Sequence, residues 1–241
     1  MSWIDGALVG FDTETTGIDV AADRIVTAAV VRHTPDSESI TTWLIDPGIE
    51  IPAAAAAIHG ITTENARAHG RRPVEALDEI AQALSDALLR DEPVVAFNAS
   101  FDLSLLESEL RRHHLPTLAD RIGRDVKTVI DPLVLDRHLD RFRRGKRQLG
   151  DLCNHYAVTT SAALHTADVD VLATLEVLRA IARAFPEVTS MPLENLHNLQ
   201  VTAHRTWAEH LNAWRTKQGL TGPGAELTWP MRDSVPARAS S

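Results

Sequence analysis

The stretch Ala7–Gly17 reads ALVGFDTETTG and joins a short apolar run to two acidic residues. The apolar part, Ala7–Phe11, predicts a buried strand that ends where the acidic, Thr and Gly residues begin. Asp12 and Glu14 are two residues apart at the end of this strand, so both side chains leave the same face. Two such carboxylates repel each other unless a cation lies between them, and oxygen ligands favour Mg²⁺ or Mn²⁺. The alternative is that both residues cap a surface turn.

The segments that follow predict a mixed sheet. Strands are expected at Arg24–Arg32 and Ser39–Ile45, and the loop between them is short enough for an antiparallel hairpin. Two more strands, Val94–Phe97 and Val129–Asp131, alternate with helices. The expected helices are Pro52–Ile58, Pro73–Arg90, Ser100–His114, Pro132–Arg141, Leu149–Tyr156 and Ala167–Phe185. Three strands in a meander followed by strand–helix alternation predict an α/β fold, with a five-stranded mixed sheet and helices on both faces.

The chain is expected to divide near Phe185-Pro186, so that residues 1–186 form the main domain. Beyond this point apolar residues recur at threes, fours and sevens, which predicts one amphipathic helix within 187–218. A single apolar stripe is too small for an independent core, so this appendage is expected to pack on the main domain or on another chain. Residues 219–241 are rich in Gly, Pro, Ala and Ser, which predicts a loose tail.

Composition and charge exclude several classes of protein. The 241 residues are 44% hydrophobic, which is enough for a packed core. The only cysteine is Cys153, so no intrachain disulfide is possible. Neither a signal peptide nor an apolar stretch of about 18 residues is present, so a cytoplasmic protein without a membrane partner is expected. The formal net charge of −9 means that a nucleic-acid ligand would need bound metals or a local basic patch.

Two further motifs place acidic residues at the starts of helices. In AFNASFD an apolar strand runs into Asn98, and Asp102 falls in the first turn of the next helix, where the helix dipole favours an anion. In LHTADVD, His165 lies on the loop before a helix and Asp170 within its first turn. Taken alone, each motif fits an ordinary helix start, and a lone histidine there is usually a surface residue.

Together the three motifs resemble those of the DEDDh 3′–5′ exonucleases, and most closely the proofreading epsilon subunit of bacterial DNA polymerase III and its stand-alone relatives. The resemblance covers about Leu8 to Phe185 and rests on DTETTG, NASFD and the His-x-Ala-x-x-Asp pattern. It implies a ribonuclease H-like fold and hydrolysis of DNA from the 3′ end to 5′-mononucleotides, in proofreading or repair. The catalytic residues that it implies are, in chain order, Asp12, Glu14, Asp102, His165 and Asp170.

The resemblance also implies a mechanism with two divalent cations, Mg²⁺ or Mn²⁺, about 3.5–4 Å apart. Asp12 would bridge both ions. Glu14 and Asp170 would complete the first site, and Asp102 would hold the second. His165, neutral at working pH, would take the proton from the attacking water.

Substrate contacts are expected around these residues. The family carries a His-Gly-Ile sequence near the terminal nucleotide, which His59-Gly60-Ile61 matches. Five residues before this histidine the polymerase subunit has a glutamate, whereas this chain has Ala54, which removes a substrate contact but no metal ligand. The other substrate-binding residues expected near the motifs are Thr13, Thr15, Asn98 and Phe101.

The basic run RFRRGKR at Arg141–Arg147 is a second candidate for nucleic-acid binding, with five basic side chains in seven residues. Arg143, Arg144 and Lys146 would neutralise phosphates. Phe142 would stack on a base. The alternative is a solvated loop between two helices, with Phe142 turned into the core.

Two other functions stay open at this point. The first is the same chemistry on RNA, as in ribonuclease T and oligoribonuclease, since the contacts to a 2′-hydroxyl that decide it cannot be read from the sequence. The second is a non-catalytic accessory module of a polymerase, against which the complete set of active-site residues argues. The expected ligand is a single-stranded or frayed 3′ end, and the expected protein partner is a polymerase subunit or a second copy of the chain.

Overall fold

A five-stranded mixed sheet forms the centre of the protein. The computed structural model describes residues 2–159 and 164–232. The strand order is β3-β2-β1-β4-β5, with β1, β2 and β3 antiparallel and with β4 and β5 parallel to β1. This architecture confirms the expected fold class. The strands are β1 Leu8–Thr15, β2 Ile25–His33, β3 Glu38–Leu44, β4 Val94–Val95 and β5 Val129–Ile130.

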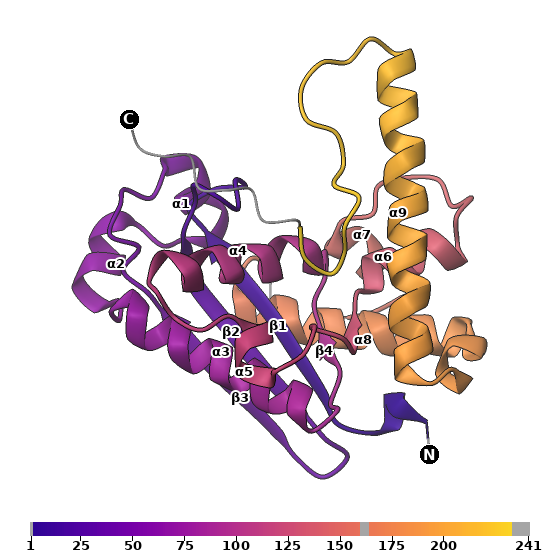
Figure 1. Ribbon diagram of the computed structural model, residues 1–241, viewed down its shortest axis with the longest axis horizontal. Helices are drawn as coiled ribbons and strands as arrows, with labels where there is room; N and C mark the ends of the chain where they lie inside the picture. Colours follow the sequence, from indigo (N-terminus) through magenta and orange to yellow (C-terminus); the bar gives the residue numbers. More distant parts are fainter. Residues whose placement is uncertain (1, 160–163, 233–241) are drawn as a thin grey trace.

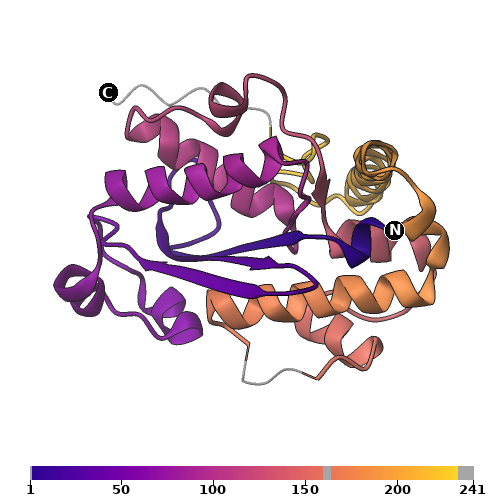
Figure 2. The same cartoon turned by 90° about the horizontal axis from the view of Figure 1, so that it is seen from below.

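Helices cover both faces of this sheet, as Figure 1 and Figure 2 show. On one face α3 and α4 pack, and on the other α8 packs against β1 and β2. Two short helices, α2 and α5, were not among those expected; a threonine side chain caps each of them. The helices and 3-10 turns are η1 Trp3–Asp5, α1 Ala53–His59, α2 Thr63–His69, α3 Pro73–Leu89, α4 Ala99–Arg112, α5 Leu118–Ile122, α6 Pro132–Leu139, α7 Leu149–His155, α8 Ala167–Ala184, η2 Pro186–Ser190 and α9 Leu193–Lys217.

Strand β1 is longer than expected and carries the acidic residues within it. The expected end at Phe11 is wrong, because pairing with β2 continues through Asp12 and Glu14 as far as Thr15. Val9 and Phe11 pack in the apolar cluster on the α3/α4 face, whereas Leu8 packs in the cluster on the α8 face. Since side chains alternate along a strand, Asp12 and Glu14 point to the α8 face.

Gly10 lets α8 approach β1 closely. A Cβ added to Gly10 would collide with Cγ1 of Val171 and lie 3.3 Å from Cγ of Leu175. Both of these α8 residues are buried, and Asp170 precedes Val171 directly. The missing side chain at Gly10 therefore sets how near the start of α8 comes to the acidic end of β1.

The C-terminal helix α9 packs against α6 and β5. Its Gln200 side chain accepts the backbone N–H of Asp131 at 2.7 Å and donates to the carbonyl of Val129 at 3.1 Å, so it occupies polar groups that the edge strand β5 would otherwise leave open. No helix within the described ranges has an apolar stretch long enough to cross a bilayer.

Residues 225–232 return along the protein and pack against it, as Figure 1 shows for the segment after α9. Asn212 of α9 holds the backbone of Ala225 through two hydrogen bonds, and Ser104 of α4 accepts the backbone N–H of Arg232. Trp229 is 5% exposed and joins the apolar cluster on the α4 face. The expectation of a loose tail is wrong for these residues, because a large apolar side chain anchors them; residues 233–241 lie outside the described part.

The close approach at Gly10 gives a testable prediction. Gly10→Ala is expected to lower the free energy of unfolding by about 1–3 kcal/mol, as overpacking does, and to lower Tm by several degrees. The control is Gly150→Ala, where an added Cβ would meet Leu164 at an ordinary 3.4 Å. Thermal unfolding followed by circular dichroism measures both variants. An unchanged Tm for Gly10→Ala would contradict the close packing of α8 on β1.

Candidate active site

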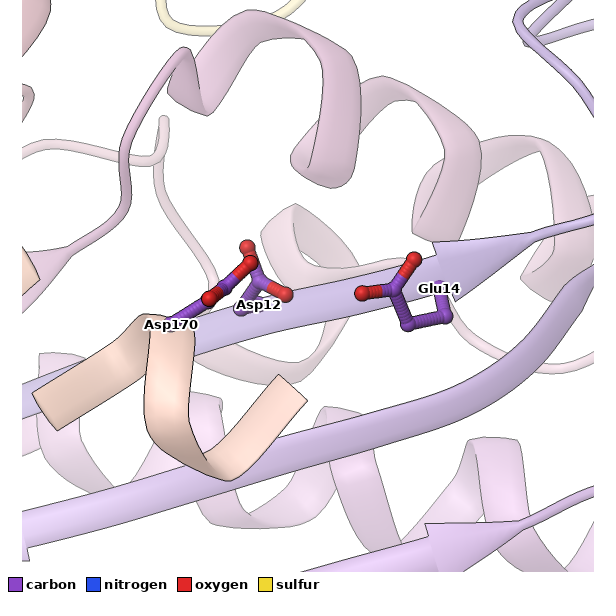
Figure 3. Close-up of side chains that lie close together, drawn as sticks. All are labelled: Asp12, Glu14 and Asp170. Carbon is purple, nitrogen blue, oxygen red and sulfur yellow. The ribbon is translucent and has the colours of Figure 1, made fainter. Parts of the chain in front are cut away.

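Three carboxylates converge where β1 meets the start of α8. Asp12 and Glu14 come from β1 and Asp170 comes from the first turn of α8, and each offers an oxygen atom within 4.8 Å of the others. Figure 3 shows the carboxylates of Asp12 and Asp170 close together, with Glu14 further along the strand and turned towards them. The structure therefore brings together three of the four expected metal ligands.

Asp102, the fourth expected ligand, reaches the same place from α4. It is 4% exposed, and its Oδ1 accepts the backbone N–H of Thr13 at 3.1 Å and the Thr13 hydroxyl at 2.6 Å. Because Thr13 follows Asp12 on β1, these two bonds hold Asp102 beside Asp12. The hydroxyl of Thr13, which was expected to bind substrate, is thus engaged with Asp102.

A buried aspartate that the sequence analysis did not single out fixes the start of α4. The carboxylate of Asp131 accepts the backbone N–H groups of Asn98, Ala99 and Leu133, at 2.9–3.1 Å. Asn98 has a left-handed backbone, with φ of 60°. These bonds tie the turn before α4 to the turn before α6, and so position Asp102 four residues after Asn98. The Asp-Pro sequence at the start of α6 was the available signal, because aspartate is a favoured N-cap.

The electrostatics of this cluster favour a cation. Burial raises the pKa of Asp12 well above its usual value, and the charges of Asp102, Asp170 and Glu14 raise it further. Burial, and then the charge of Asp170, raises the pKa of Glu14 to about 7. Burial raises the pKa of Asp102 to about 7 against the hydrogen bonds from Thr13, and burial also raises that of Asp170. Four crowded carboxyl groups that resist ionisation are a donor set suited to hard divalent cations.

His165 lies beside this cluster at the start of α8. Its backbone N–H donates to Oδ1 of Asp170 at 3.1 Å, and its backbone has a φ of 94°, which is rare for a residue other than glycine. The side chain is exposed and lies outside the group of three converging carboxylates. The structure thus places His165 next to Asp170 but not among the candidate metal ligands.

His59, at the end of α1, lies near the other end of the acidic stretch. Its Nδ1 accepts the backbone N–H of Ile61 at 3.1 Å, and its Nε2 is buried without a hydrogen-bond partner among the described residues. Burial lowers the pKa of His59, and the backbone of Thr15 partly offsets this. The Thr15 hydroxyl donates to the carbonyl of Gly17. Ala54 is exposed on the same helix α1.

A pocket of about 380 Å³ opens beside Asp12 and Asp102. It is lined by three expected substrate residues, Thr13, Asn98 and Phe101, together with residues that no sequence motif marked, among them Arg137. The lining residues are Asp12, Thr13, Phe97, Asn98, Phe101, Asp102, Leu133, Arg137, Arg147, Gln148 and Leu149.

The basic loop is divided between internal and exposed residues. Arg143, expected to bind phosphate, donates to the fully buried carboxylate of Asp136 at 2.9 Å and is 10% exposed. Its charge is therefore used inside the protein. Arg144 and Lys146 are exposed, so only these two of the three expected residues are open to a ligand. Phe142 is 84% exposed, which excludes the alternative that it turns into the core.

Comparison with known proteins identifies the family. The family model described as exonuclease, RNase_T, matches residues 9–178, more than half of the chain. The chain belongs to this exonuclease family. The match confirms the resemblance expected from the three motifs.

The DNA polymerase III PolC-type of Streptococcus thermophilus is 32% identical over 173 residues, which are 70% of this chain and 11% of that protein. The PolC-type polymerase of Lacticaseibacillus paracasei is 27% identical over 197 residues, 81% of this chain and 12% of the relative. The chain thus spans about a tenth of the length of these relatives.

Solved exonuclease structures share the fold. Exonuclease I of E. coli, in complex with a dA16 oligonucleotide, superposes with a TM-score of 0.63 at 20% identity, over 83% of this chain and 44% of that one. A moderately thermophilic Exonuclease I from Methylocaldum szegediense gives a TM-score of 0.61 at 22% identity, over 87% of this chain and 46% of that one. At this level of identity the likeness shows that this chain shares the fold of these structures, and no more than the fold.

The raised pKa values predict how the metal-free protein responds to pH. Between about pH 4 and pH 7 the unfolded carboxyl groups are ionised, while Glu14 and Asp102, whose folded pKa values are about 7, stay largely protonated, so the free energy of unfolding falls as pH rises. Asp12→Asn removes part of this loss. In EDTA its Tm is therefore expected to exceed that of the unmodified protein at pH 7.5 but not at pH 4.

Mn²⁺ should reverse this order by raising only the Tm of the unmodified protein at pH 7.5. The control is Asp36→Asn, an exposed aspartate in the turn between β2 and β3. Equal Tm values for Asp12→Asn and the unmodified protein at both pH values in EDTA would contradict the described effect of burial and neighbouring charges on Asp12.

Proposed function

We propose that the protein is a 3′–5′ exonuclease that hydrolyses DNA from the 3′ end with two divalent cations, Mg²⁺ or Mn²⁺. The observation that carries this proposal is the cluster of Asp12, Glu14 and Asp170, with Asp102 held beside it. Water would attack the terminal phosphodiester, the bond from phosphorus to the 3′ oxygen of the preceding nucleotide would break, and a 5′-mononucleotide would leave a shortened strand with a 3′-hydroxyl.

The four carboxylates would together bind the two cations. We assign Asp12 to both ions, because it interacts electrostatically with Glu14, Asp102 and Asp170. Glu14 and Asp170 would complete one site, and Asp102 would serve the other. When bound, the two ions would stabilise the charge that develops on the attacking and leaving oxygens.

His165 is the proposed general base. It lies at the exposed edge of the cluster, where water has access, and its backbone N–H donates to the carboxylate of Asp170, a proposed metal ligand. A neutral imidazole there would take the proton from the attacking water. His59 stays the proposed neighbour of the terminal nucleotide, with Thr15 beside it.

Single-stranded or frayed DNA is the proposed substrate. Support comes from the related folds, since the Exonuclease I structures include complexes with dA16 and dT13 oligonucleotides, and from the PolC-type relatives.

Arg144 and Lys146 would attract the strand, and replacing both with glutamine would weaken the dependence of KM on salt. The proposed role is the removal of mispaired 3′ nucleotides, either by this protein alone or together with a polymerase.

The proposal is tested by digestion of 5′-labelled strands in Mn²⁺ or Mg²⁺. The expected result is a ladder that shortens from the 3′ end on single-stranded DNA, faster on mispaired than on paired 3′ ends, and none in EDTA or with Asp170→Asn. Matched RNA strands are digested in parallel. Faster digestion of RNA than of DNA would show that RNA is the preferred substrate. Binding without cleavage of either strand would favour a non-catalytic module.

Removal of the proposed base should separate proton transfer from metal binding. His165→Ala is expected to lower kcat by about 10²–10⁴-fold and to leave the Mn²⁺ affinity unchanged. In the unmodified protein kcat should fall at acid pH, and this decline should be lost in the variant. The measurement is kcat against pH at saturating metal. An unchanged acid decline in the variant would show that another group is the base.

A further inference from the structure

Arg137 of α6 lines the pocket beside the acidic cluster. Within residues 2–159 and 164–232 its guanidinium makes no hydrogen bond and no ion pair. The other arginine of the pocket, Arg147, donates instead to the Asp136 carboxylate and to the carbonyl of Asp140. A half-buried guanidinium with open donors in a pocket indicates a place for an anionic ligand.

The nearby carboxylates of Asp131 and Asp136 interact with Arg137 electrostatically, but their oxygen atoms are engaged by other donors. The Asp131 carboxylate accepts three backbone N–H groups. Asp136 is bound by Arg143 and Arg147. A guanidinium keeps its positive charge at neutral pH, although burial lowers the pKa of Arg137. The positive charge of Arg137 therefore stays available inside the pocket.

Trp207 of α9 fixes the orientation of this guanidinium. Cζ of Arg137 lies 3.8 Å from the centre of the Trp207 ring, within the range of a cation–π contact. Stacking occupies one face of the guanidinium and leaves its N–H groups free in their plane. A planar set of donors matches the oxygens of a phosphate better than it matches a neutral ligand.

The pocket lies at the opposite end of the acidic stretch from His59. It opens beside Asp12 and Asp102, whereas His59 interacts with the backbone of Thr15, three residues further along β1. The proposed function places the terminal nucleotide near His59. The rest of the strand, with its remaining phosphates, would then leave the acidic cluster through the pocket that contains Arg137.

We propose that Arg137, oriented by Trp207, binds a backbone phosphate of the strand that is being shortened, on the side of the cleaved bond away from the terminal nucleotide. The C-terminal helix α9 is thereby part of the substrate site and more than an addition to the fold. This inference rests on the proposed function, so its test separates the binding of the strand from the cleavage reaction.

The test compares two substrates. One is a single-stranded DNA oligonucleotide. The other is the p-nitrophenyl ester of thymidine 5′-monophosphate, whose only phosphate is the one that is cleaved. Arg137→Gln is expected to raise KM for the oligonucleotide by about tenfold or more and to reduce the slope of log KM against log salt by about one. Hydrolysis of the ester should be unchanged.

Trp207 provides a second pair of variants. Trp207→Ala should raise KM for the oligonucleotide alone, by a smaller factor, and Trp207→Phe should keep the stack and the KM. The control is Arg205→Gln, which removes one charge from an exposed position on α9. It should change neither KM for the oligonucleotide nor hydrolysis of the ester. If Arg137→Gln does not fold, as judged by Tm, the two Trp207 variants decide the outcome.

The outcomes distinguish the inference from the function on which it rests. An equal loss on both substrates in Arg137→Gln, or an unchanged KM for the oligonucleotide, would overturn the inference and leave the nuclease assignment intact. Hydrolysis of neither substrate by the unmodified protein would instead overturn the proposed function. The affinity for the oligonucleotide in EDTA, measured by fluorescence anisotropy, would then test the role of Arg137 alone. Equal affinities of the unmodified protein and Arg137→Gln would refute that role.

Discussion

The contact between α8 and β1 at Gly10 is the constraint on which the site depends. Burial of Val171 and Leu175 against the sheet brings the start of α8 to the acidic end of β1, and so brings Asp170 to Asp12. Without a cation these carboxylates are costly to ionise, because burial raises the pKa of Asp12 and of Asp170 and the charges around Asp12 raise its pKa further. Apolar packing therefore holds in place a group of charges that electrostatics alone would separate.

A second set of contacts links the site to the C-terminal helix. Asp131 fixes the turn before α4 through its side chain, and its own backbone N–H donates to Gln200 of α9. The same helix stacks Trp207 on Arg137 in the pocket. Residues that follow the family match at 9–178 thus contact both the frame of the site and its pocket.

Local sequence patterns were sufficient to predict much of this structure. The period-two spacing of Asp12 and Glu14 placed both on one face, and the helix-start position of Asp102 placed it at the correct end of the sheet. Periodicity also located the strands and most of the helices. These features depend on neighbours close in sequence, where the geometry of a strand or a helix fixes the direction of each side chain.

Features set by contacts between distant residues were not predictable in this way. Nothing local shows that Arg143 is paired with Asp136 inside the protein and Arg144 is not. Trp229 packs in an apolar cluster with residues of α4 and α9, which are distant from it in sequence, and the stacking of Trp207 depends on where α6 lies. The length of β1 was underestimated because acidic residues are uncommon in strands, and pairing with β2 outweighed that preference.

The most direct test of the central claim is a crystal structure of the protein with Mn²⁺ and thymidine 5′-monophosphate, in which anomalous scattering locates the metal. The account predicts Mn²⁺ bound by oxygen atoms of Asp12, Glu14 and Asp170 at about 2.0–2.3 Å, with the phosphate of the nucleotide in contact with the metal. A structure in which the nucleotide binds but Mn²⁺ is found only away from these carboxylates would contradict it.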